Sequence, residues 1–140
     1  MKKRFLALVM ICCMIISVIP VASNAAIPPQ IQPQWTNTVL VSTNISFNGS
    51  TGSVTASITG RAGVSNITAK IKLYYKNSSG SWVEIQNDWS YSVNQSYFYK
   101  VENFTVVAGR EYQAVMTATV YKDGYAEPVS KTDTAICPTT

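Results

Sequence analysis

The chain has 140 residues, enough for one domain, with a net charge of +4 and no histidine. Residues 1–25 have the features of a removable segment, and without them 8 basic residues face 7 acidic ones, a net charge of +1. The nearly neutral charge argues against a basic nucleic-acid binder. Cys137 is the one remaining cysteine, which argues against a multi-disulfide scaffold. The lack of histidine argues against histidine-based catalysis or metal binding.

Residues 1–25 are predicted to be a secretory signal peptide, folded as a helix. Residues 2–4 are basic, residues 5–16 are an unbroken apolar run, and cleavage is expected after Ala25, with Ala26 as the near alternative. A membrane anchor needs about 20 apolar residues, and this run is shorter. We therefore expect a secreted, extracellular protein that has no membrane attachment after cleavage.

Residues 26–34 contain three of the six prolines and are predicted to be a Pro-rich linker or arm. From Trp35 the composition changes to valine, isoleucine, threonine and aromatic residues, which favour strands. Residues 35–138 are the predicted β-sandwich domain.

Apolar and polar residues alternate with a period of two in several runs, a pattern typical of strands with one buried face. Turn-forming residues separate these runs, and Asp123-Gly124 is a strong hairpin signal. The fold class expected is all-β, an antiparallel seven-stranded sandwich. The predicted strands lie near residues 37–47, 53–60, 66–76, 81–92, 97–106, 110–122 and 125–136.

Residues 104–121 resemble a corner of immunoglobulin-like and fibronectin type III-like sandwiches, where a tyrosine early in the sixth strand hydrogen-bonds back across the turn. Tyr112 would be that tyrosine. The inter-sheet cysteine pair of immunoglobulin domains is absent, because Ala114 stands two residues after Tyr112. The chain also resembles small uncharacterised secreted proteins of Gram-positive bacteria, which have a leader followed by one such domain. This resemblance implies an immunoglobulin-like sandwich and no particular activity.

No catalytic residue, cofactor or metal ligand is predicted. Seven acidic residues follow residue 25, but none belongs to a catalytic or calcium-binding motif, and Cys137 alone cannot build a zinc site. Cys137 has two interpretations: a small apolar residue closing the last strand, or a reachable thiol that forms an intermolecular disulfide.

Aromatic residues that fall out of phase with the apolar positions are the predicted ligand-binding residues, because exposed aromatic rings can stack on sugars or anchor a protein partner. Cross-strand aromatic pairing is the competing explanation. The candidates are Tyr74, Trp82, Trp89, Tyr91, Tyr97, Tyr99 and Tyr121.

These observations lead us to expect a non-catalytic binding module whose partner is an extracellular glycan or protein, with no nucleic-acid partner. A monomer is expected, with a disulfide-linked dimer as the alternative. The second function considered is a structural or assembly protein that self-associates through sheet edges or Cys137. A hydrolase is the third.

Overall fold

In the computed structural model, which describes residues 34–139, antiparallel strands form two sheets and these residues contain no helix. The prediction of an all-β antiparallel fold is confirmed. The predicted signal peptide over 1–25 and all but the last residue of the predicted arm over 26–34 lie outside the described residues. Over 34–139, no helix is long and apolar enough to cross a membrane.

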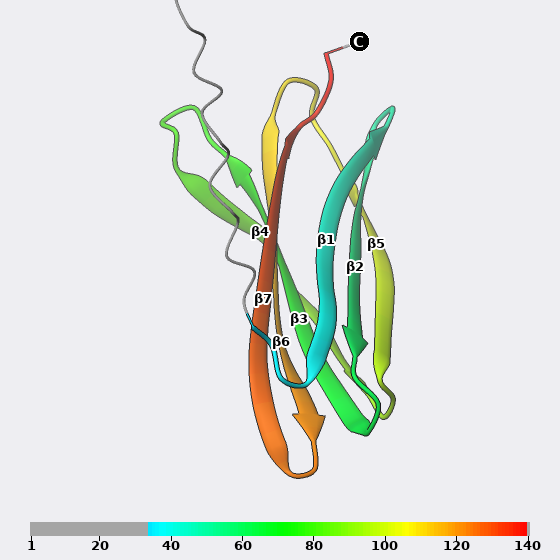
Figure 1. The fold of residues 1–140 in the computed structure, drawn as a ribbon. Helices are drawn as coiled ribbons and strands as arrows, with labels where there is room; N and C mark the ends of the chain where they lie inside the picture. The colour runs from blue at the N-terminus through cyan, green and yellow to red at the C-terminus, as the bar shows by residue number, and fades with distance from the viewer. Residues whose placement is uncertain (1–33, 140) are drawn as a thin grey trace, which may run out of the picture. The chain divides into compact units, whose positions relative to one another are not determined.

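The strands are packed as a sandwich of a three-stranded sheet and a four-stranded sheet. In chain order they are β1 (Thr38–Asn48), β2 (Thr51–Gly60), β3 (Val64–Lys76), β4 (Trp82–Val93), β5 (Tyr97–Thr105), β6 (Glu111–Lys122) and β7 (Tyr125–Ile136). The first sheet has the order β1-β2-β5 and the second the order β4-β3-β6-β7. Figure 1 shows β1 and β7, the edge strands of different sheets, side by side along one lateral side of the sandwich. β4 and β5 are the remaining edge strands.

The core forms because alternate residues of each strand point into the space between the sheets. On β3, Ile71 is buried while its neighbour Lys70 is exposed, and β6 alternates in the same way. Burying each large aliphatic side chain stabilises the fold by about 1.5–3 kcal/mol. The largest buried side chains include Tyr112, Phe98, Ile58, Ile67, Ile71, Leu73 and Met116.

A two-residue turn joins β6 to β7. Asp123 has a φ of 51° and Gly124 a φ of 80°, so both central residues are in the left-handed region. This is the geometry of the type I′ turn that the Asp-Gly pair predicts, and its twist matches that of the flanking strands. The turn therefore sets the register of β7 against β6.

Carboxylates of β7 hold the edge of β1. The side chain of Glu127 accepts hydrogen bonds from the backbone N–H of Thr36 and Asn37 and, at 2.7 Å, from the Thr38 hydroxyl. Further along the strand, Asp133 Oδ2 accepts the N–H of Ile45 at 2.7 Å. Backbone groups at the β1 edge are thereby satisfied by side chains of the other sheet.

Candidate binding surfaces

Tyr97 and Tyr99 on β5 are the most exposed of the predicted binding aromatics, with 48% and 51% of their surface accessible. Their ring centroids are 6.5 Å apart and their planes differ by 7°. The rings share one face because residues two apart on a strand point the same way. Val101, 43% exposed, continues the row. We call Tyr97, Tyr99 and Val101 the tyrosine strip.

Short hydroxyl side chains border the tyrosine strip on β2. The register places Thr59 opposite Tyr97, and Ser57 and Thr55 opposite the next two members of the strip. Because these side chains are shorter than tyrosine, the aromatic rings stand above the neighbouring strand. The surface combines parallel aromatic rings with hydroxyl donors and acceptors, and such a surface suits an amphipathic ligand.

The outer face of the four-stranded sheet carries a shallow groove of about 610 Å³. Its lining includes short polar side chains, one lysine and one proline, contributed by all four strands: Thr68, Lys70, Ser90, Thr117, Thr119, Pro128 and Ser130. Lys70 has no ion-pair partner among the described residues. Tyr97 and Tyr99 do not line this groove, so the groove and the tyrosine strip are separate surfaces on different sheets.

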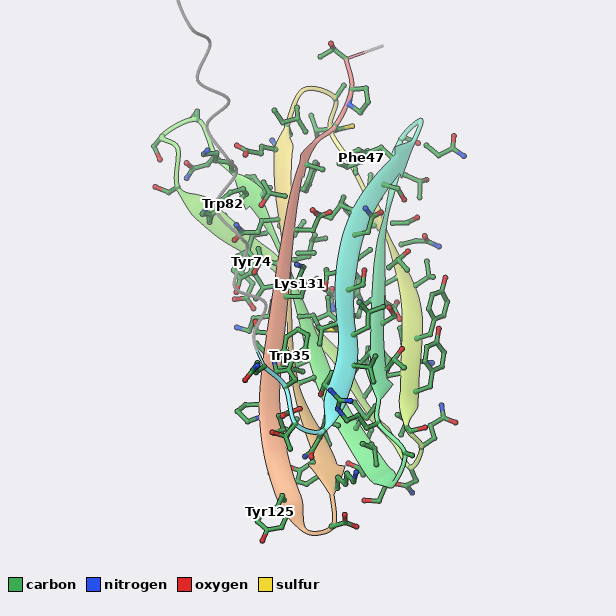
Figure 2. The ribbon with its side chains drawn as sticks, in the orientation of Figure 1. Trp35, Phe47, Tyr74, Trp82, Tyr125 and Lys131 are labelled. Atoms are coloured by element: carbon green, nitrogen blue, oxygen red, sulfur yellow. The ribbon has the colours of Figure 1, made fainter. Side chains whose placement is uncertain are left out.

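Tyr74 and Trp82 also lie on the four-stranded sheet, near the end that carries the β3–β4 turn (Figure 2). The ammonium of Lys76 lies 5.4 Å from the centre of the Trp82 ring and 2.8 Å from a Glu111 oxygen. Tyr74 pairs with Glu84 across the strands. Charged neighbours therefore occupy the space around both rings, and the face of Trp82 already holds a cation.

Tyr121 shares this outer face but lies far from Tyr74. Tyr121 pairs with Asn66 on β3, and Asn66 and Tyr74 are separated by about eight strand residues, roughly 26 Å at 3.3 Å per residue. The sequence candidates on this sheet therefore do not form one binding surface.

Trp89 and Tyr91 face the interior of the sandwich. They pair with the buried Ile71 and Ala69, and both pack against the core. The register between β3 and β4 shifts on either side of Leu73, and such a bulge changes which residues of a strand point inward. Alternate positions counted along the strand from the polar residues before Trp89 predict that Trp89 and Tyr91 point outward. The prediction is wrong because such a count cannot detect a bulge.

Tyr91 links the two sheets between β4 and β5. Its hydroxyl donates a short hydrogen bond to the Glu102 carboxylate, and the Lys100 ammonium lies 5.3 Å from the centre of its ring. Burial, and then the hydrogen bond to Glu102, raise the pKa of Tyr91 to about 12. This tyrosine stays neutral at physiological pH and acts as a bridge.

Tyr125 is an exposed aromatic that the sequence analysis did not single out. It is 76% exposed, just after the β6–β7 turn (Figure 2). The signal available in the sequence was its position next to Asp123-Gly124, because a side chain beside a tight turn has few neighbours to cover it.

The acidic residues with described side chains have structural roles. Glu127 and Asp133 hold the β1 edge, Glu102 binds Tyr91, and Glu84 and Glu111 pair with lysines. Asp123 lies in the β6–β7 turn. Across the described part of the chain, no group of three or more potential metal-ligating side chains comes together.

Tyr112 and Cys137 both lie in the core. The Tyr112 hydroxyl accepts the N–H of Val107 at 2.8 Å, five residues earlier and across the turn before β6. Cys137 is 2% exposed, and its backbone pairs with Arg110 and Gly109. A disulfide to a second chain would therefore require the C-terminal segment to leave the core.

No protein-family model matches the sequence, and none of the curated proteins shows significant similarity to it. The functional argument therefore depends on the surfaces described above.

Proposed function

We propose that the protein is a secreted, non-catalytic binding module that binds an extracellular glycan on the tyrosine strip. The observation that carries this proposal is the pair of parallel, half-exposed rings of Tyr97 and Tyr99. Sugar rings have apolar faces that stack on aromatic rings and hydroxyl edges that need hydrogen-bond partners. The hydroxyl side chains of β2 beside the strip would supply those partners.

Three features of the chain favour binding over catalysis. The chain contains no histidine, which is the commonest general acid or base. The carboxylates with described side chains have structural partners or lie in a turn, as Glu127 and Asp133 do at the β1 edge. The tyrosine strip lies on the outer face of a sheet, where water is not excluded from a ligand.

Export is part of this proposal because residues 1–25 have the three-part pattern of a secretory signal peptide. We also assign the domain to the immunoglobulin-like sandwiches of the fibronectin type III kind. Support for that assignment comes from the strand order β1-β2-β5 against β4-β3-β6-β7 and from the hydrogen bond of Tyr112 across the turn before β6.

The test is binding of the purified domain to an array of bacterial cell-wall and host polysaccharides. We expect the wild type to bind at least one class of glycan, and the double variant Tyr97→Ala/Tyr99→Ala to lose at least tenfold in affinity. Tyr125→Ala is the matched control, since it removes a more exposed tyrosine that belongs to the other sheet and should leave binding unchanged. A wild type that binds no glycan, or a double variant that binds as well as the wild type, would overturn the proposal.

A further inference from the structure

The free edge of β5 presents a defined set of backbone groups. Hydrogen bonds from Gly60 N to Ser96 O (2.7 Å) and from Val106 N to Ser50 O (3.1 Å) show that the even-numbered residues bond to β2. In an antiparallel strand the alternate residues direct their N–H and C=O groups to the other side. Tyr99, Val101 and Asn103 therefore direct theirs away from β2.

This edge is open along its centre. Gln95 Nε2 donates to the carbonyl of Tyr97 at 2.7 Å and so covers one end. The edge backbone groups of Tyr99, Val101 and Asn103 have no hydrogen-bond partner among the described residues. An unpaired edge of this length is a template for another strand.

The sequence of β5 is complementary to itself about Val101. If a second copy pairs antiparallel with Val101 opposite Val101, Lys100 lies opposite Glu102 of the second copy, and the same pair forms again across the two-fold axis. Phe98 then lies opposite Phe104 of the second copy. These even-numbered positions would be the closely spaced, non-hydrogen-bonded pairs, in which side chains across two strands are nearest.

The two charged residues select this register. Inward-facing charges on an edge strand normally prevent pairing with another strand. If one copy shifts by two residues relative to the other, Lys100 lies opposite Lys100 or Glu102 lies opposite Glu102, depending on the direction of the shift. Like charges then repel and disfavour these registers. Lys100 has no ion-pair partner among the described residues, and Glu102 uses one oxygen for Tyr91, so both can accept the intermolecular contact.

We propose that two copies of this chain pair through β5 in antiparallel register about Val101, which joins the two three-stranded sheets into one. The pairing also brings the tyrosine strips of both copies onto one continuous face. A dimer would then carry both strips in one row, although the proposal does not depend on what the strips bind.

The test is sedimentation equilibrium of the full domain with charge-reversal variants. We expect a concentration-dependent dimer for the wild type, and at least a tenfold weaker association for Lys100→Glu and for Glu102→Lys alone. Both the double variant Lys100→Glu/Glu102→Lys and an equimolar mixture of the two single variants should restore the dimer, because opposite charges again face each other. Lys131→Glu on β7 is the control and should dimerise as the wild type does.

A second variant separates pairing from folding. The N–H of Val101 points away from β2, so Val101→Pro removes the central intermolecular hydrogen bonds and spares the β2–β5 ladder. It should be monomeric with a wild-type circular dichroism spectrum. A wild type that stays monomeric at millimolar concentration, a Val101→Pro variant that still dimerises, or a mixture of single variants that does not associate would overturn the proposal.

Discussion

Along one lateral side of the sandwich, carboxylates of β7 accept N–H groups from the β1 edge, whereas along the other side the edge of β5 pairs with no strand within residues 34–139. Both sides carry acidic residues, but the carboxylates on the two sides bind different groups. Glu127 and Asp133 bind backbone groups, while Glu102 binds the phenol of Tyr91. From this difference we propose that the β1/β7 side contributes to stability and that the β4/β5 side is available to a partner.

The largest expected effect is that of removing Glu127. We expect Glu127→Ala to lower the free energy of unfolding by about 3 kcal/mol, because buried donors at Asn37 and Thr38 lose their charged acceptor. Urea denaturation of Glu102→Ala is the comparison on the open side, with an expected loss of about 1 kcal/mol. If the two variants lose equal amounts of unfolding free energy, the two sides do not differ in their contribution to stability.

The same carboxylate predicts a dependence on acid. Burial alone raises the pKa of Glu127, but hydrogen bonds from Thr38, Asn37 and Thr36 outweigh it and hold the pKa below its ordinary value. The folded form therefore binds fewer protons than the unfolded form in this range. The stabilisation is complete above the ordinary carboxyl pKa of about 4.3 and is lost as the pH falls through the lowered folded value. Between about pH 5 and pH 3 the wild type should lose more stability than Glu127→Gln.

Asp133 should have the second largest effect. Asp133→Ala leaves the N–H of Ile45 without an acceptor, and we expect a loss of about 2 kcal/mol in chemical denaturation. Asp123→Ala, in the β6–β7 turn and away from the β1 edge, is the control for losing one acid. An Asp133→Ala variant as stable as the wild type would show that this contact does not hold β1.

Thr43 on β1 offers a smaller change of opposite sign. Its side chain is buried, and its hydroxyl has no hydrogen-bond partner among the described residues. Thr43→Val keeps the shape and removes the unsatisfied hydroxyl, so we expect a gain of about 1 kcal/mol. Thr55→Val on the outer face of β2 should change stability far less. A destabilised Thr43→Val would mean that the hydroxyl has a bonding role.

The smallest change concerns Tyr91 on the open side. NMR titration of its ring should give a pKa of about 12, and Glu102→Gln should lower the value because the carboxylate hydrogen bond is lost. The raised pKa adds stability that is complete below the ordinary tyrosine pKa of about 10 and disappears as the pH rises through the folded value. A Tyr91 that titrates at the ordinary tyrosine pKa would show that the bridge to Glu102 is absent.

Local patterns predicted the individual strands well. The expected strand over residues 66–76 is β3 (Val64–Lys76), and the Asp123-Gly124 hairpin has the expected turn type. The strand was predicted from the alternation of apolar and polar residues, and the hairpin from its turn residues. Each of these signals lies in residues that are adjacent in the sequence. The inward orientation of Trp89 and Tyr91 depends on a register shift opposite Leu73, and that shift arises from pairing between two strands.

The lateral contacts could not be predicted in this way. Ile45 and Asp133 are 88 positions apart in the chain, and nothing near either residue indicates that β1 will lie beside β7. The tyrosine strip was predicted in part, since Tyr97 and Tyr99 were candidates. Their separation from Tyr74 and Trp82 follows from the assignment of β5 to the other sheet.

Amide hydrogen exchange at the two edges tests the difference between the lateral sides most directly. The N–H of Ile45, bound by Asp133, should be protected at every protein concentration. The N–H groups of Tyr99, Val101 and Asn103 should exchange much faster in dilute protein and become protected as the concentration rises and β5 pairs with a second copy. Rapid exchange at Ile45, or protection at Val101 that does not change with concentration, would contradict this account.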